Sequence, residues 1–302
     1  MHTIERVTEG FSLGEGPHWD ASTQSLYFVD VFGQSIVKYA PTTKKVTKAS
    51  VAPKTASFII PVEGAKDQFV ISLNNELVII LWDGESDSAK IVEKLASVDN
   101  KFNDAKCDST GRLWAGGHTL NESDFMNSGP LGHLFSLDSN KQLKKCLDKI
   151  RVANGLAFND KVKKMYYIDS LAGTVDWFDF DVNSGTISNR QVLFTLKKHN
   201  VTGIADGMTI DTDGNLWVAV FGGNRVLKID GNKSETLLDT INMPAEQVTS
   251  VAFGGRNLDE LFVTTGRFET DEKKLPAPVN GATYRVTGTG AKGLPGVSFK
   301  LN

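Results

Sequence analysis

The sequence predicts an all-β protein, a six-bladed β-propeller with four-stranded antiparallel blades around a central channel. One strand–turn–strand unit recurs along the 302-residue chain at a period of roughly 40–50 residues, which is typical of propeller blades. Radial repetition of such sheets leaves only short, protected strand edges. No window shows the i, i+3, i+4, i+7 apolar spacing of an amphipathic helix over three turns.

The clearest copy of the unit runs from Ile204 to Asp230. It predicts strands at Met208–Ile210, Leu216–Phe221 and Arg225–Ile229, which are rich in β-forming residues. Turns containing Gly and Asn, residues that tolerate positive φ, separate these strands. A side chain just ahead of the first strand would face the same central space in every copy.

The other copies share the apolar first strand, the turn and the second strand. They begin near Gly16, Phe58, Asn103, Asn154 and Ser250. The N-terminal residues 4–7 are expected to complete a final blade begun by the C-terminal part of the chain. Since no linker interrupts the repeat, residues 1–302 are predicted to form a single propeller domain. A sandwich or irregular barrel is the alternative for a strand-rich chain, but it requires no such period.

Composition and charge exclude several functions. A net charge of −3 argues against nucleic-acid backbone binding as the main role. No apolar stretch is long enough for a membrane span, and the N-terminal ten residues do not resemble a signal peptide. Two cysteines do not make a disulfide framework. We therefore expect a cytoplasmic protein, a monomer or weak dimer, that binds a small molecule.

The position preceding each innermost strand is the candidate site, because these positions line one mouth of the channel. They are Glu15, Ser57, Asn103, Asn154, Asp206 and Ser250. Four of them carry a carboxylate or an amide, hard oxygen ligands that suit Ca²⁺, Mg²⁺ or Mn²⁺ better than a structural zinc site. A cation held this way can polarise a carbonyl and activate water. Asp-Gly and Asn-Gly are also common turn signals, so each residue taken singly has a structural interpretation.

Four segments carry a family resemblance. Gly14–Trp19, Phe102–Lys106, Ala153–Ala157 and Ala205–Asp211 together resemble the SMP30/regucalcin/gluconolactonase family. The insect branch, which includes luciferin-regenerating enzyme, is the most similar. The resemblance extends in order over essentially the whole chain and implies a six-bladed propeller with one divalent metal on its axis.

The resemblance also implies roles for individual residues. Glu15, Asn154 and Asp206 would bind the metal, with Ca²⁺ the leading candidate and Mn²⁺, Zn²⁺ and Mg²⁺ as alternatives. Asn103 and Lys101 would contact the substrate. In lactone-hydrolysing members, the carboxylate that matches Asp206 is the proposed general base.

Two departures bear on the substrate. Sugar-lactonase members of the family carry Arg where this chain has Lys101, and Lys lacks the bidentate fork. The acidic residue that helps to hold sugar hydroxyls is replaced by Leu120 or Asn121, which disfavours a polyhydroxylated substrate. His118 lies near the predicted mouth and is either a polar wall of the pocket or a loop histidine. His18 is expected to be structural.

The predicted function is a divalent-metal-dependent hydrolase of lactones or related cyclic esters. One alternative is a calcium-binding regulatory protein without essential turnover, which would use the axial site alone, since the nearest acidic loop, Asp211–Asn215, lacks the rest of an EF-hand. Another is a luciferin-regenerating enzyme acting on oxyluciferin. A serine hydrolase is disfavoured because no G-x-S-x-G elbow is present.

Overall fold

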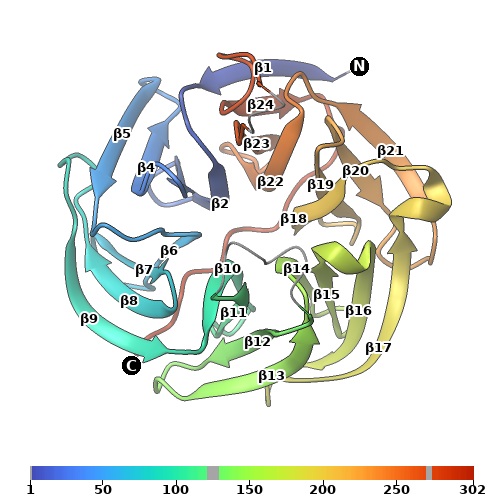
Figure 1. Ribbon diagram of the computed structural model, residues 1–302, viewed down its shortest axis with the longest axis horizontal. Coiled ribbons are helices and arrows are strands. Elements are labelled where there is room, and N and C mark those ends of the chain that lie inside the picture. Colours follow the sequence, from blue (N-terminus) through green and yellow to red (C-terminus); the bar gives the residue numbers. More distant parts are fainter. Residues whose placement is uncertain (1, 121–128, 270–273) are drawn as a thin grey trace.

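Small antiparallel sheets stand radially around a central axis in the computed structural model, which describes residues 2–120, 129–269 and 274–302 (Figure 1). Four are separate four-stranded sheets. The eight-stranded sheet consists of two further four-stranded blades, joined by the single pair Phe221↔Gln247. The fold is therefore the predicted six-bladed propeller.

The blades follow one another along the chain, each with its innermost strand first. Blade 1 has β2 (Gly14–Asp20), β3 (Ser25–Asp30), β4 (Ser35–Ala40) and β5 (Lys45–Ser50). Blade 2 has β6 (Ile59–Pro61), β7 (Gln68–Leu73), β8 (Glu76–Leu81) and β9 (Lys90–Ser97). Blade 3 has β10 (Asn100–Cys107), β11 (Leu113–Thr119), β12 (Gly132–Leu137) and β13 (Leu143–Ile150).

The second half of the ring is built in the same way. Blade 4 has β14 (Ala153–Asn159), β15 (Lys164–Asp169), β16 (Thr174–Asp181) and β17 (Thr186–Thr195). Blade 5 has β18 (Ile204–Ile210), β19 (Leu216–Phe221), β20 (Arg225–Ile229) and β21 (Leu237–Asn242). Blade 6 has β22 (Gln247–Gly254), β23 (Glu260–Gly266), β24 (Thr283–Thr287) and the N-terminal β1 (Thr3–Thr8).

The N-terminal strand closes the ring. β1 pairs antiparallel with β24, with Ile4 opposite Val286. The expectation that residues 4–7 complete the last blade is confirmed. Closure joins the first and the last strand of the chain within one sheet and covers the outer edge of β24.

Helix is almost absent from residues 2–120, 129–269 and 274–302. The described parts of the chain contain only short 3₁₀ turns, η2 (Ser170–Ala172) and η3 (Leu196–His199), and no α-helix. Within these same parts, no helix is long and apolar enough to cross a membrane. The two cysteines are free; Cys107 is buried at the end of β10 and Cys146 is partly exposed in β13.

A buried Asp–Trp pair anchors the turn between the first two strands of blades 3 and 5. The Trp217 indole N–H donates to the Asp211 carboxylate at 3.1 Å, and the backbone N–H of Asn215 donates to the same carboxylate at 2.8 Å. Trp114 and Asp108 repeat the indole bond at 2.9 Å. The Asp211–Asn215 loop is thus a structural turn held by its own side chains.

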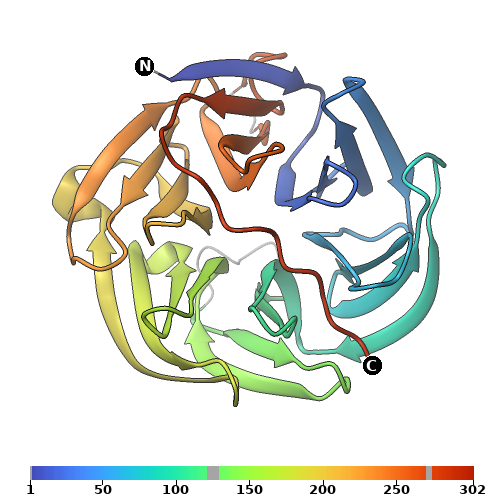
Figure 2. The same cartoon turned by 180° about the vertical axis from the view of Figure 1, so that it is seen from behind.

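The C-terminal strap, residues 288–302, crosses the axis on one face of the ring (Figure 2). Its backbone is bonded to the loops that follow three innermost strands or to their ends. Thr212 N–H donates to Lys292 O at 2.8 Å, Phe299 N–H to Pro61 O at 2.8 Å and Lys300 N–H to Gly111 O at 2.9 Å. The innermost strands therefore end at the strap face and begin at the opposite face, called here the mouth face.

Candidate functional site

The predicted site residues lie at β-bulges in the innermost strands. The pairing register shifts between Glu15 and His18, Phe102 and Ala105, Ala153 and Leu156, and Ala205 and Met208. Glu15, Asn103, Asn154 and Asp206 were expected just ahead of the first strands, and in this respect the prediction is wrong because each lies inside its strand. A bulge leaves a residue unpaired and re-aims its side chain without ending the strand.

Glycine follows two of these oxygen donors because neighbouring blades nearly touch at the axis. A Cβ on Gly155 would lie 2.7 Å from the backbone oxygen of Asp206, in the next blade. A Cβ on Gly207 would lie 2.0 Å from Ser250 Oγ, again one blade further. These Asn-Gly and Asp-Gly pairs are therefore contact points between inner strands and not chain turns.

Carboxylates from three blades lie close enough to repel one another. Burial raises the pKa of Glu15 well above its usual value, and the negative charges of Asp206 and Asp104 raise it further. Burial raises the pKa of Asp206 in the same way, with Asp104 adding to the effect and a hydrogen bond from Asn154 opposing it. The structure thus gathers Glu15, Asp104, Asn154 and Asp206 into one group, called here the hub.

The two amide side chains of the site are oriented by the hydrogen bonds that their nitrogen atoms donate. Asn154 Nδ2 donates to Ser170 Oγ at 3.0 Å, and Asn154 is buried. Asn103 Nδ2 donates to the backbone oxygen of Ala153 at 2.9 Å. Because the nitrogens bond to the blades, each amide oxygen stays available as an acceptor or cation ligand.

Lys101 and His118 are cross-strand partners at the start of β10 and the end of β11. Lys101 is buried, and the His118 ring nitrogen Nδ1 lies 2.8 Å from Thr119 O. Both residues therefore lie at the mouth-face end of blade 3, as the predicted substrate contacts should. Leu120 is exposed at the end of this ladder, and Asn121 lies outside the described residues.

Two buried aspartates behind the hub were not identified from the sequence. Asp30 Oδ1 accepts hydrogen bonds from the N–H groups of Ser12 and Leu13, each at 3.0 Å, and Leu13 lies two residues before Glu15. The Asp169 carboxylate accepts from the N–H of Val152 at 3.0 Å, two residues before Asn154. Each carboxylate fixes the chain segment that enters a site-bearing strand.

These aspartates follow a spacing that could have revealed them. Asp30 and Asp169 each come 15 positions after the site residue of their blade. The same separation joins Ser57 to Ser72 by a 2.8 Å hydroxyl contact, and Thr249 to Thr264 by one of 2.9 Å. In these four blades, the spacing identifies a second-strand residue that bonds to the inner strand or to the segment entering it.

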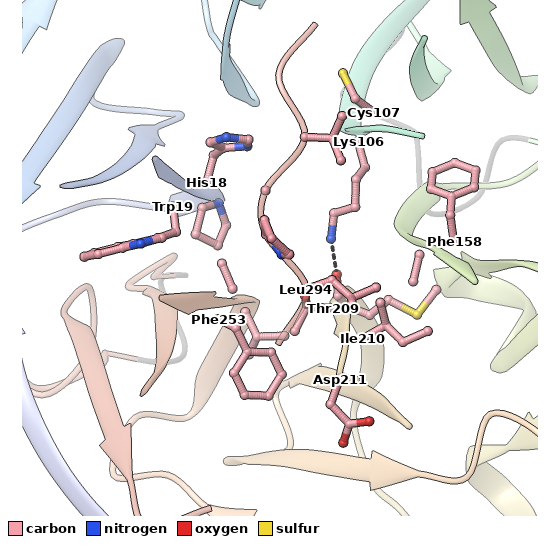
Figure 3. Close-up of a pocket in the computed structure, with 18 of the residues that line it drawn as sticks. His18, Trp19, Lys106, Cys107, Phe158, Thr209, Ile210, Asp211, Phe253 and Leu294 are labelled. Atoms are coloured by element: carbon pink, nitrogen blue, oxygen red, sulfur yellow. Dashed lines mark hydrogen bonds between the residues drawn. The ribbon is translucent and has the colours of Figure 1, made fainter. Parts of the chain in front are cut away.

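A cavity of about 270 Å³ lies between the hub and the C-terminal strap. Lys106 reaches across it from β10, and its Nζ donates to the backbone oxygen of Met208 at 2.7 Å (Figure 3). The sequence marks Asp104 and Lys106 only as members of the segment Phe102–Lys106, yet Asp104 belongs to the hub. Glu15, Asn154 and Asp206 do not line this cavity, so they border the channel from its mouth side.

The donor chemistry of the hub fits a hard divalent cation. Three mutually repelling carboxylates with an amide oxygen beside them favour Ca²⁺, Mn²⁺ or Mg²⁺ over a soft-ligand metal. Among the described residues, no group of three or more His, Cys, Asp and Glu is arranged to hold a metal. The three hub carboxylates, Glu15, Asp104 and Asp206, therefore do not form such a group, and the predicted ligand set consists of two carboxylates and an amide.

Comparisons with known proteins support the family resemblance seen in the sequence. Residues 13–267 match a family model described as the SMP-30/Gluconolactonase/LRE-like region. Regucalcin of Xenopus laevis is 35% identical over 299 residues, covering 97% of this chain and 96% of that protein. A solved structure of luciferin-regenerating enzyme superposes with a TM-score of 0.94 at 44% identity, covering 100% of both chains. A calcium-binding regucalcin from Agrobacterium tumefaciens superposes with a TM-score of 0.85 at 19% identity, covering 99% of this chain and 98% of the other, and shows the shared fold.

Proposed function

The chain belongs to the SMP-30/gluconolactonase/LRE-like family, and we propose that it is a divalent-metal-dependent hydrolase of lactones or related cyclic esters. The observation that supports the proposal is the gathering of Glu15, Asn154 and Asp206 at one hub, where burial and like charge act on both carboxylates. A gathering of negative charge without a matching cation is costly for a fold. A cation bound at the hub would offset this cost by neutralising the carboxylates.

Three of the four hub residues, Glu15, Asn154 and Asp206, would hold the metal, with Ca²⁺ the leading candidate. When bound, the cation would stabilise the negative charge that develops on the carbonyl oxygen of the ester and lower the pKa of a bound water. Asn103 and Lys101, beside the hub on β10, would bind and orient the ring.

Asp206 is the proposed general base. Its carboxylate would take a proton from the attacking water, whose oxygen bonds to the carbonyl carbon. The ring carbon–oxygen bond then breaks, and the ring oxygen leaves as a hydroxyl once it has received a proton, giving a hydroxy acid.

A panel of small lactones tests the proposal. Hydrolysis is measured after treatment with EDTA and then with Ca²⁺, Mn²⁺, Zn²⁺ or Mg²⁺ added back. We expect activity to disappear on chelation and return with at least one cation. Asp206→Asn should lower kcat by 10²-fold or more, on the order expected for loss of a general base. Asp213→Asn, an exposed carboxylate in the same blade, is the matched control. Hydrolysis that survives both EDTA and Asp206→Asn would contradict the proposed chemistry.

A second candidate function is cation binding without turnover. The same hub supports it, and the Xenopus laevis relative carries the name regucalcin. Cation binding in titration calorimetry, together with no hydrolysis of any lactone, would favour it.

A third candidate is the reaction of luciferin-regenerating enzyme, since the solved structure of that enzyme is 44% identical to this chain. Oxyluciferin therefore belongs in the panel. The cytoplasmic location and the monomeric or weakly dimeric state stay predictions.

A further inference from the structure

Two exposed phenylalanines lie together on the mouth face. The side chains of Phe32 and Phe268 are 47% and 50% exposed, and no other phenylalanine in the described parts of the chain is exposed to this degree. Their ring centroids are 5.6 Å apart at an interplanar angle of 38°. The residues are far apart in the sequence, so the fold brings the two rings together. Neighbouring exposed apolar rings on a soluble protein commonly mark a binding surface.

A buried polar side chain fixes the backbone at or next to each phenylalanine. Gln247, the first residue of β22, is buried and donates from Nε2 to Phe268 O at 2.8 Å. Its Oε1 accepts from Phe268 N–H at 2.7 Å. Asp30 Oδ1 accepts from Gly33 N–H at 3.2 Å and so fixes the turn that carries Phe32. Hydrogen bonds to Gln247 and Asp30 therefore fix the backbone that carries the two phenylalanines.

The segments that carry the two phenylalanines also contact the strand that carries Glu15 of the hub. Asp30 is opposite Gly14 in the β2–β3 ladder, and Gly14 precedes Glu15. Leu13 forms an isolated bridge with Gly266. Phe32 follows Asp30 by two residues and Phe268 follows Gly266 by two, so each phenylalanine Cα lies within about 7 Å of that of the rung residue it follows. The rings thus stand beside the entry to the strand that carries Glu15.

We propose that the Phe32–Phe268 pair binds an apolar substituent of the substrate while the ester ring lies at the hub. The inference rests on the proposed hydrolase function and names its substrate class: lactones or related cyclic esters that carry an alkyl or aryl group. Two adjacent aromatic faces offer contact area to such a group and no hydrogen-bonding partner for a sugar hydroxyl. Exposed Leu120, at the end of β11, adds apolar surface to the same face.

A homologous series of γ-lactones with alkyl chains of increasing length tests the proposal. We compare kcat/KM for the wild type, the double variant Phe32→Ala/Phe268→Ala and the control Val92→Ala, a 48% exposed side chain on the outer strand β9. The wild-type value should rise with chain length. The double variant should lose about tenfold or more with the longest chain and stay within twofold with unsubstituted γ-butyrolactone, while Val92→Ala behaves as wild type. Equal losses for both lactones, or no loss, would overturn the proposal.

A binding measurement separates this inference from the hydrolase function. The probe is 5-phenylpyrrolidin-2-one, a lactam that resists hydrolysis, compared with unsubstituted pyrrolidin-2-one by saturation-transfer NMR on the wild type and the double variant. Preference for the phenyl compound that is lost in the double variant supports the aromatic site even if no lactone is turned over. Equal binding of the two lactams by the wild type would overturn it. Because both rings are exposed, we expect the double variant to keep the wild-type melting temperature.

Discussion

The Asp30 carboxylate accepts a 3.0 Å hydrogen bond from the backbone N–H of Leu13, two residues ahead of Glu15. The same oxygen also accepts from Ser12 and Gly33, and Asp30 is buried. One side chain therefore fixes both the entry to a site-bearing strand and the turn beside it. A buried acceptor with three backbone donors leaves all three unsatisfied when it is removed.

Asp30→Ala should destabilise the protein by about 3 kcal/mol or more, because hydrogen bonds to charged groups contribute about 1.5–3 kcal/mol each and are not additive. Asp30→Asn keeps an acceptor and should cost less. Chemical denaturation measures both, and calorimetry should show weaker cation binding for either variant. Asp83→Ala is the control, since Asp83 accepts similar backbone bonds in an exposed turn of blade 2. If Asp30→Ala lowers stability no more than the control does, the positioning role is refuted.

The contact between Gly155 and Asp206 leads to a second prediction. A methyl group on Gly155 would meet both the Asp206 oxygen and the Met208 nitrogen at 2.7 Å, so two blades would have to move apart. Overpacking of this kind costs about 1–3 kcal/mol. We expect Gly155→Ala to lower both stability and cation affinity. Gly129→Ala has open space around it and should change neither, and equal behaviour of the two variants would argue against close contact at the axis.

Burial and repulsion within the hub predict that removing the Glu15 charge stabilises the metal-free protein. The pKa of Glu15 is raised in the folded protein, so the folded state holds this proton more tightly than the unfolded state. The group consequently favours folding below its unfolded pKa and disfavours it as pH rises through the raised value. Glu15→Gln should therefore increase the melting temperature of the EDTA-treated protein at pH 7.

Added Ca²⁺ should reverse that order. A cation at 100 times its dissociation constant stabilises the wild type by about 2.7 kcal/mol, and the Glu15→Gln variant should show little of this gain. Thermal denaturation with and without Ca²⁺ measures both effects. A variant that melts below the wild type in EDTA, or that gains as much from Ca²⁺, would be inconsistent with a cation bound through Glu15.

The sequence predicted the ring because each blade repeats short-range signals. In the clearest copy of the unit, the second and third predicted strands, Leu216–Phe221 and Arg225–Ile229, have the observed bounds of β19 and β20, since apolar alternation and Gly-containing turns are local. The first strand begins at Ile204 and not at the predicted Met208, because the apolar pattern covers only its C-terminal end. Asp206 lies there, at a bulge that pairing with β19 reveals.

The rest of the site depends on contacts between blades. Asp104 lies beside Asn103 in the sequence, but its effect on Glu15 and Asp206 arises only when three blades meet. The C-terminal strap carries no periodic pattern and is positioned by single backbone bonds. The Phe32–Phe268 pair joins turns of two blades that become neighbours only when β1 closes the ring. Such features follow from closure of the ring, which the local pattern does not describe.

His18 should make the fold sensitive to acid. Burial lowers the pKa of His18 to about 4, Asp20 opposes this shift, and the Lys106 ammonium adds to it. Between pH 4 and the usual value of about 6.5, the unfolded chain binds a proton that the folded protein does not. Stability should therefore rise with pH across this window and be lost as pH falls through it. Since the His18 imidazole is half-buried, the loss of folding free energy at pH 4 should be about 1–3 kcal/mol.

Guanidinium denaturation of the wild type and His18→Gln between pH 4 and 7 measures this contribution. The difference in unfolding free energy between the wild type and His18→Gln should vary with pH only below about 6.5. His18 also lies against the strap, since a Cβ on Gly296 would be 3.0 Å from its Nε2. Protonation should therefore loosen the strap first, and amide exchange of Phe299 and Lys300 should accelerate at pH 5 in the wild type more than in His18→Gln. Identical pH slopes for the two proteins would show that His18 is not the group responsible.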